Sequence, residues 1–269
     1  STSVRLTWRA NAAAAPMPAY ELLDIARYNR ITVQTSRGCP WRCSFCASSI
    51  LLTHKYKQKP AAQVLAEIDY IRSLWPRPFI EFADDNSFCH RAYWKALLPE
   101  IAKRQIKWFA ESDLAIHEDD ELLRLMREAG CVEVLIGLES PTSEGLDGVE
   151  TKCNWKLSRV PQYRDAIRRI QAQGIRVNAC FVLGLDGQTT RVFDQVLDFV
   201  AEALPFDVQV TVPTPFPGTP MFAQLQREGR LLADRAWERC TLFDVNFRPT
   251  HMSPQELAAG LRQMIVALY

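Results

Sequence analysis

The stretch Thr35-Ser-Arg-Gly-Cys39-Pro-Trp-Arg-Cys43-Ser-Phe-Cys46 places three thiols on one short loop. Thiolates are soft ligands, which suit iron–sulfur clusters or zinc. Ordinary clusters and structural zinc sites use four protein ligands, but the nearest later candidates, His54 and Cys89, do not form a second ligand pair. The stretch therefore predicts a metal centre with one open position for a cofactor or substrate, and zinc or inert core thiols are the alternatives.

The cysteine loop follows an apolar segment, and the pattern of strand followed by helix then repeats along the chain. Strands are expected at residues 31–35, 79–83, 106–110, 132–136, 176–183 and 207–212. Helices are expected at residues 61–75, 90–104, 119–129, 159–173, 190–203, 221–239 and 254–268, and residues 141–157 are expected to be irregular. Strands that alternate with helices predict right-handed crossovers and a parallel sheet, so the fold class is α/β.

The polar residues with unusual chemistry fall just after the predicted strands. They comprise the three thiols, Asp84-Asp85, Glu111-Ser112, Glu139-Ser140 and Asp186. A flat, doubly wound sheet commonly carries a glycine-rich phosphate loop after its first strand, and this chain has cysteines there instead. In β/α barrels the site is assembled from the C-terminal ends of the strands, so we expect one site made by several loops.

The cysteine spacing, with Phe45 directly before the third thiol, resembles the signature of the radical S-adenosylmethionine (SAM) superfamily. The resemblance implies that Cys39, Cys43 and Cys46 hold a [4Fe–4S] cluster whose fourth iron is chelated by SAM. It also implies a partial (β/α)6 TIM-like barrel with extra C-terminal helices. The expected domains are an N-terminal linker at 1–30, the barrel at 31–220 and a helical extension at 221–269 that is truncated.

Three further stretches resemble the SAM-binding motifs of that superfamily. Asp84-Asp85-Asn86 resembles the motif that holds the SAM ammonium, in the form found in the cobalamin-binding subgroup; helix capping is the alternative. Glu111, Ser112, Glu139 and Ser140 stand where the family binds ribose and the SAM carboxylate, and they too could be helix caps. Val182 and Gly184 belong to a stretch whose backbone contacts adenine in the family, although Gln188 departs from its pattern and a generic glycine turn is the rival.

Composition restricts the classes of protein. The chain has 269 residues, 48% of them hydrophobic, with a net charge of +1, which gives no electrostatic reason to expect a nucleic acid or membrane partner. No apolar run approaches the ~20 residues that span a bilayer. Eight cysteines, three of them clustered, favour a reducing compartment and metal binding over a disulfide framework, so we expect a cytoplasmic protein.

The resemblance predicts the activity. A radical SAM enzyme cleaves SAM reductively to a 5′-deoxyadenosyl radical that abstracts hydrogen from a small-molecule substrate, and it needs an external electron donor such as flavodoxin or ferredoxin. The subgroup implies a cobalamin-dependent methyltransferase, but these residues contain no Asp-x-His-x-x-Gly motif, so another domain must supply cobalamin. The alternative is a non-catalytic iron–sulfur or zinc-binding module. The sequence identifies neither a catalytic residue nor the substrate.

Overall fold

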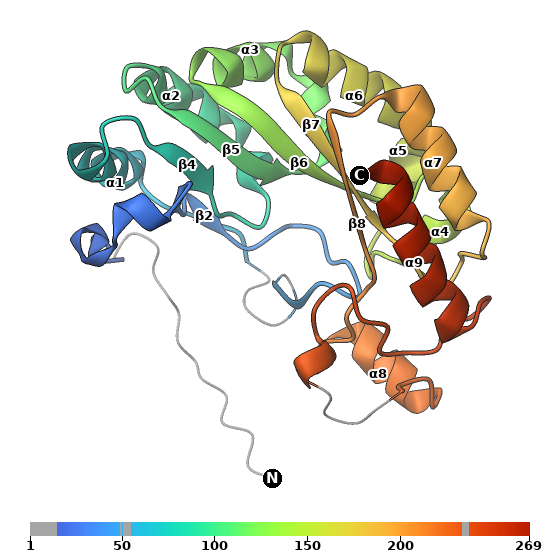
Figure 1. Ribbon diagram of the computed structural model, residues 1–269. Coiled ribbons are helices and arrows are strands. Elements are labelled where there is room, and N and C mark those ends of the chain that lie inside the picture. Colours follow the sequence, from blue (N-terminus) through green and yellow to red (C-terminus); the bar gives the residue numbers. More distant parts are fainter. Residues whose placement is uncertain (1–14, 49, 51–54, 233–236) are drawn as a thin grey trace.

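A curved, parallel six-stranded sheet forms the centre of the computed structural model, which describes residues 15–48, 50, 55–232 and 237–269 (Figure 1). Neighbouring strands follow the order β1-β4-β5-β6-β7-β8, and every pair is parallel. The strands are β1 (Ile31–Val33), β4 (Phe79–Phe82), β5 (Lys107–Ser112), β6 (Cys131–Glu139), β7 (Arg176–Val182) and β8 (Asp207–Thr211). A small antiparallel pair, β2 (Ser36–Arg37) with β3 (Lys57–Gln58), follows β1 and was not predicted from the sequence.

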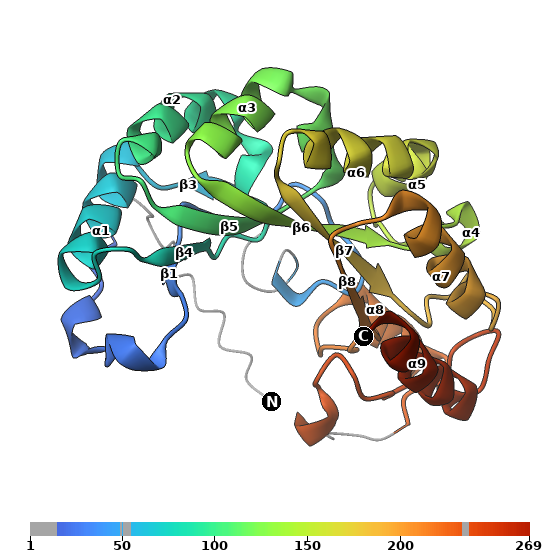
Figure 2. The same ribbon diagram turned by 45° about the horizontal axis from the view of Figure 1, so that its top comes forward.

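Helices cover the convex face of this sheet, as Figures 1 and 2 show. The crossover helices are α1 (Ala61–Leu74), α2 (Arg91–Ala102), α3 (Asp120–Glu128), α6 (Tyr163–Ala172) and α7 (Val192–Ala203), and α9 (Pro254–Leu268) packs beside α7 and β8. Three shorter helices are α4 (Ser143–Leu146), α5 (Trp155–Arg159) and α8 (Pro220–Arg227). Helix α9 begins with a capping box between Ser253 and Glu256, which satisfies two of its free backbone N–H groups.

Alternation along the strands explains which face the helices cover. On β5, Trp108 and Ala110 are fully buried, and the residues between them face the other side, because successive side chains of a strand point to opposite faces. Helix α1 meets this apolar face with Val64, Ile68 and Ile71, all fully buried, at the spacing of one helical face. The convex face therefore carries the hydrophobic core.

The sheet does not close into a complete barrel. Within the described residues, β1 and β8 are the two outer strands of the sheet and do not pair with each other. The α/β prediction of a partial (β/α)6 barrel with additional C-terminal helices is confirmed. In the described part of the chain, no helix combines the length and apolar character needed to cross a membrane.

Several local predictions were wrong or incomplete. The helix expected at 221–239 ends at Arg227, and Gly229 follows with a φ of 65°, a backbone conformation that suits glycine. The segment expected to be irregular contains α4 and the start of α5. Helix α2 contains Pro99 and ends at Ala102, two residues before the expected end; the proline removes one backbone hydrogen bond from its last turns.

Candidate functional site

A pocket of about 260 Å³ lies at the C-terminal ends of the strands. It is lined by Cys39, Trp41, Cys43, Phe45, Cys46, Ser48, Asp85, Asn86, Glu111, Ser112, Asp113, Leu135, Gly137, Glu139, Lys156 and Cys180. The structure thus brings together eight of the twelve residues predicted from the sequence: the three cysteines, Phe45, Asp85, Glu111, Ser112 and Glu139. Asp84, Ser140, Val182 and Gly184 lie outside this pocket, and His54 lies outside the described residues.

Backbone pairing holds the cysteine loop against a distant segment. Cys43 forms an isolated antiparallel bridge with Glu150. Ser44 donates its backbone N–H to the Val149 carbonyl at 2.7 Å, and Thr151 donates to the Arg42 carbonyl at 2.9 Å. The loop is therefore fixed by the segment after α4, which the sequence left as an irregular connection.

The three thiols are free and form no disulfide; Cys43 is buried, and Cys39 and Cys46 are half-buried. Burial raises the pKa of Cys39 to about 11 and that of Cys43 to about 12, so both are protonated until a metal displaces the proton. Among the described residues, no three His, Cys, Asp or Glu side chains lie close enough together to share a single metal ion. A four-iron cluster does not require this, because each cysteine binds a different iron, and three thiols beside an open pocket fit that group.

Asp84 and Asp85 are neighbours in sequence with different surroundings. Asp84 is buried, and its Oδ1 accepts the backbone N–H groups of Thr35 and Ser36 at 2.7 and 2.8 Å. Asp85 lines the pocket and accepts the backbone N–H of Gly38 at 2.7 Å, as well as the Ser48 hydroxyl. Asp84 therefore holds the chain where β1 turns into the cysteine loop, and Asp85 is the carboxylate that reaches the pocket.

A second group of contacts beside the thiols was not predicted. The Asn86 Nδ2 lies 3.8 Å from the Cys39 sulfur and donates to Asp113 Oδ2 at 2.8 Å. The Trp41 indole donates to the same Asp113 oxygen at 2.7 Å. These contacts orient an amide toward the Cys39 sulfur; hydrogen bonds to sulfur are one of the factors that tune iron–sulfur centres. The Asp113 side chain also caps the 3₁₀ helix Leu114–Glu118. Asp113 directly follows the predicted Glu111-Ser112 pair, so its place after a strand is the feature of the sequence that could have identified it.

Glu139 forms a buried ion pair that the sequence also did not reveal. Lys156 Nζ lies 2.5 Å from Glu139 Oε1 and donates to the Gly137 carbonyl at 2.7 Å. Burial alone would lower the pKa of Lys156, but the Glu139 carboxylate and the Cys43 sulfur beside it raise that pKa above its usual range. Glu139 has a φ of 64°, a conformation that residues other than glycine rarely adopt and that often marks functional sites.

Glu111 connects the pocket to the interior of the curved sheet. It also lines a cavity of about 460 Å³, together with Arg30, Phe79, Glu81, Phe109, Glu133, Leu135, Asn178 and Gln209. Burial among protein atoms, with the charges of Glu81, Asp85 and Asp84, raises the pKa of Glu111 to about 7. Ser112 lines the pocket and donates its hydroxyl to the Asp113 carbonyl at 3.0 Å.

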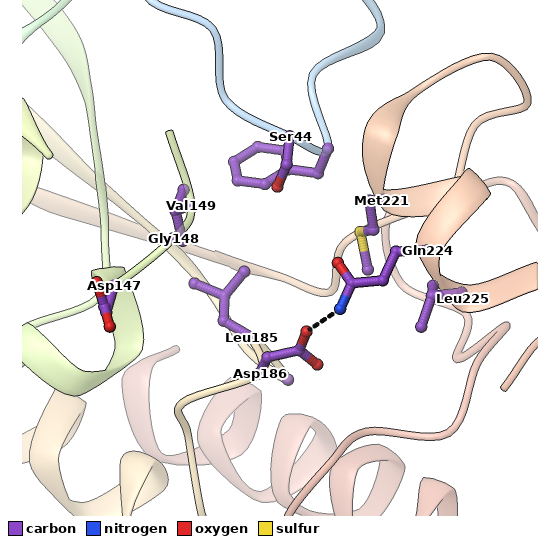
Figure 3. Close-up of a pocket in the computed structure, with 11 residues that line it drawn as sticks. Ser44, Asp147, Gly148, Val149, Leu185, Asp186, Met221, Gln224 and Leu225 are labelled. Atoms are coloured by element: carbon purple, nitrogen blue, oxygen red, sulfur yellow. Dashed lines mark hydrogen bonds between the residues drawn. The ribbon is translucent and has the colours of Figure 1, made fainter. Parts of the chain in front are cut away.

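Figure 3 shows a second, smaller pocket, and Phe45 lines both this pocket and the first one. The close-up shows that it joins Ser44 of the cysteine loop, Asp147 to Val149, the turn after β7 and helix α8. Gly184 lines it, with a φ of 96°, and a Cβ there would meet the Leu257 side chain of α9 at 2.6 Å. The backbone conformation thus requires glycine at this position, and the Leu257 side chain leaves little room for a larger residue.

Gln188 closes the turn after β7. Its Oε1 accepts the backbone N–H groups of Gly184 and Leu185 at 2.7 and 3.1 Å, and its Nε2 donates to the Val182 carbonyl at 3.1 Å. The backbone groups predicted to face adenine therefore have partners within the turn. Ser140 is fully buried and packs closely against Gly145 at the start of α4, which places it in the connection between β6 and α4.

Comparisons with known proteins agree with this architecture. Residues 33–200 match the radical SAM superfamily model, and residues 219–269 match a domain of unknown function, DUF4070. The chain is 31% identical to the hopanoid C-2 methylase of Rhodopseudomonas palustris, over 81% of this chain and 42% of that protein. It is 29% identical to an uncharacterised methyltransferase of Synechocystis sp., over 92% of this chain and 46% of that protein.

Two solved structures share the fold. The methyltransferase TsrM from Kitasatospora setae, with cobalamin and a [4Fe-4S] cluster bound, has a TM-score of 0.70 at 20% identity, covering 89% of this chain and 51% of that chain. The cobalamin-dependent SAM radical enzyme OxsB has a TM-score of 0.68 at 18% identity, covering 96% of this chain and 44% of that chain. The chain spans about half the length of the curated relatives and solved structures named here. From the match over 33–200, the chain belongs to the radical SAM superfamily.

Proposed function

We propose that this chain is the catalytic barrel of a radical SAM enzyme in which Cys39, Cys43 and Cys46 hold a [4Fe–4S] cluster. The observation that carries the proposal is the pocket that the three thiols share with Asp85 and Glu139. Three thiol donors leave one iron of such a cluster without a protein ligand, and the pocket beside them leaves room for a cofactor. When bound, the cluster supplies the electron that cleaves SAM to methionine and a 5′-deoxyadenosyl radical.

The pocket residues then take distinct parts in binding SAM. Asp85 would accept hydrogen bonds from the cofactor ammonium, while Asp84 keeps the cysteine loop in place through Thr35 and Ser36. Phe45, which lines both pockets, would contact adenine. Glu111 and Ser112, at the end of β5, would bind the ribose.

The turn after β7 shapes the adenine side of the site. Val182 belongs to a small buried apolar cluster with Cys43, Val149 and Leu185. Gly184 lines the smaller pocket. Val182 and Gly184 would form the wall of the adenine pocket, while Gln188 keeps their backbone groups in place.

The reaction on the substrate is proposed from the relatives. They include a hopanoid C-2 methylase, a bacteriochlorophyllide d C-12(1)-methyltransferase and an anaerobic magnesium-protoporphyrin IX monomethyl ester cyclase. A cobalamin-dependent methyl transfer is the activity that we propose for the longer protein, with cobalamin supplied by a domain outside these residues. The protein takes its electron from flavodoxin or ferredoxin in the cytoplasm, where its free cysteines stay reduced.

Anaerobic reconstitution with iron and sulfide tests the cluster assignment. We expect a brown protein that loses its iron when Cys43 is replaced by Ala, because that change leaves only two thiols on the cysteine loop. Cys153→Ala, which changes an exposed cysteine outside both pockets, should retain the iron. Full iron content in the Cys43→Ala protein would overturn the assignment, and a colourless protein that binds zinc would indicate a structural module.

A second measurement tests the chemistry. The reduced, reconstituted chain should convert SAM slowly to 5′-deoxyadenosine without any substrate, because the cysteines and the proposed SAM contacts all lie within these residues. It should not bind cobalamin tightly. Absence of 5′-deoxyadenosine while the cluster is present and reduced would show that these residues are not catalytically complete.

A further inference from the structure

Lys156 is a buried cation beside the cysteines, and the proposed function assigns it no role. Its side chain is 10% exposed, and it lines the same pocket as the three thiols. Lysine is almost never fully buried unless it is paired, and here its Nζ contacts both Glu139 Oε1 and the Gly137 carbonyl. Holding this charge inside the protein requires a compensating environment, which the carboxylate and the carbonyl supply.

The balance of charge around the pocket makes Lys156 conspicuous. Four carboxylates line the pocket, from Asp85, Glu111, Asp113 and Glu139. Lys156 is the only Lys, Arg or His among the described residues that line it. It lines this pocket together with Cys39, Cys43 and Cys46. The field of Lys156 therefore reaches the sulfur atoms that we assign as cluster ligands.

Other contacts hold the helix that carries Lys156 on the cysteine loop. The Trp155 ring stacks on Trp41, with ring centroids 4.6 Å apart. The Glu150 carboxylate accepts the backbone N–H of Lys156 at 2.9 Å. These contacts do not use the Lys156 amine, so removal of the amine changes the charge beside the loop while the loop keeps these attachments.

We propose that Lys156 is a positioning and electrostatic residue whose fixed charge raises the reduction potential of the cluster held by Cys39, Cys43 and Cys46. The inference rests on the proposed function, because it requires that cluster. Reduction adds one negative charge, and a nearby cation in a medium of low dielectric constant stabilises the more negative state. Net charge near the cluster is one of the factors that set the potential of iron–sulfur centres. Removal of the amine should therefore lower the reduction potential. It also leaves the negative charge of Glu139 unpaired, which lowers the potential further.

The test is a redox titration of the reconstituted cluster, monitored by electron paramagnetic resonance, in the wild type and in Lys156→Met. We expect the variant to be harder to reduce by at least tenfold, which is about 59 mV for a one-electron couple. Lys156→Arg should restore most of the potential. Lys152→Met removes the same charge from an exposed residue of the same segment that does not line the pocket, so it should match the wild type.

The double variant Lys156→Met with Glu139→Gln separates the field from a purely structural role. Because it removes both charges of the pair, its potential should return toward that of the wild type. An unchanged potential in Lys156→Met at normal iron content would overturn the inference. If Lys156→Met holds no cluster, Lys156→Arg and the double variant decide: near wild-type potentials in both support the inference, and loss of the cluster in either makes Lys156 structural. A wild type without a cluster would instead refute the proposed function.

Discussion

The two faces of the sheet consist of alternate residues of the same strands, yet they have opposite character. On the convex face, Phe82, Trp108 and Ile136 are fully buried under the helices. On the concave face, Glu81, Phe109, Glu111, Glu133, Asn178 and Gln209 line a cavity of about 460 Å³. A closed barrel fills its interior with branched apolar side chains. In this open sheet one face supplies the packing, which leaves the other face free to carry polar groups toward the site.

Replacement of neighbouring aromatic residues on β5 tests this division most strongly. Trp108 is fully buried, contacts the rings of Phe82 and Trp94, and donates its indole N–H to the Ala129 carbonyl at 2.8 Å. We expect Trp108→Ala to reduce the free energy of unfolding by about 3–5 kcal/mol. Phe109→Ala, on the concave face, should cost roughly 1 kcal/mol, since little packing is lost there. Equal losses in urea unfolding would contradict the division.

The two aspartates after β4 extend the comparison to the site. Asp84→Ala removes the acceptor of two buried backbone N–H groups, and each unsatisfied donor costs about 1–3 kcal/mol. We therefore expect a loss of about 2–6 kcal/mol in the free energy of unfolding. Asp85→Ala should cost markedly less, because Asp85 is only half-buried. A greater loss for Asp85→Ala in thermal unfolding would show that the two roles are reversed.

Binding measurements should then give the reverse order. Asp85→Asn removes the charge that we propose to hold the SAM ammonium, and a charge-assisted hydrogen bond contributes roughly 1.5–3 kcal/mol. Affinity for SAM should fall about ten- to hundredfold, with the iron content unchanged. Asp120→Asn, which alters an exposed ion pair with Arg169 on the convex side, serves as the control. Calorimetry that finds equal affinities in the two variants would remove Asp85 from the site.

The smallest expected effect concerns Glu111 and pH. Its pKa is raised to about 7 by burial and by the neighbouring carboxylates Glu81, Asp85 and Asp84. The folded protein therefore binds this proton more tightly than the unfolded chain does. This contribution to stability is present at low pH and is lost as the pH rises through the folded-state pKa.

Glu111→Gln should remove that pH dependence. At about pH 8 the variant should be more stable than the wild type by on the order of 1 kcal/mol, a value discounted for solvent screening of this accessible carboxylate. At about pH 5 the difference should be much smaller, because the wild-type carboxyl is then protonated in the folded state. Denaturant unfolding at the two pH values measures the effect. A constant difference between the variants would mean that Glu111 ionises like an ordinary surface carboxylate.

Local patterns in the sequence are enough to predict the elements of the fold and to locate the cysteine loop. Strands and helices can be predicted from local periodicity. The predicted bounds of five strands agree within a few residues with those of β1, β4, β5, β7 and β8. Strand β6 begins near the predicted position but runs three residues further, to Glu139. The cysteine spacing is likewise a local property, since the three thiols share one loop.

Which side chains meet in the pocket depends on contacts between residues that are distant in the sequence. Asp84 and Asp85 are equivalent in sequence, but contacts with residues nearly fifty positions earlier turn one toward the backbone and the other into the pocket. Trp41 reaches Asp113 across 72 positions, and Lys156 reaches Glu139 across 17. Neither pair leaves a periodic or spacing signal, because its geometry depends on how β5, β6 and α5 pack around the cysteine loop. The partners that orient and charge the site are therefore products of packing.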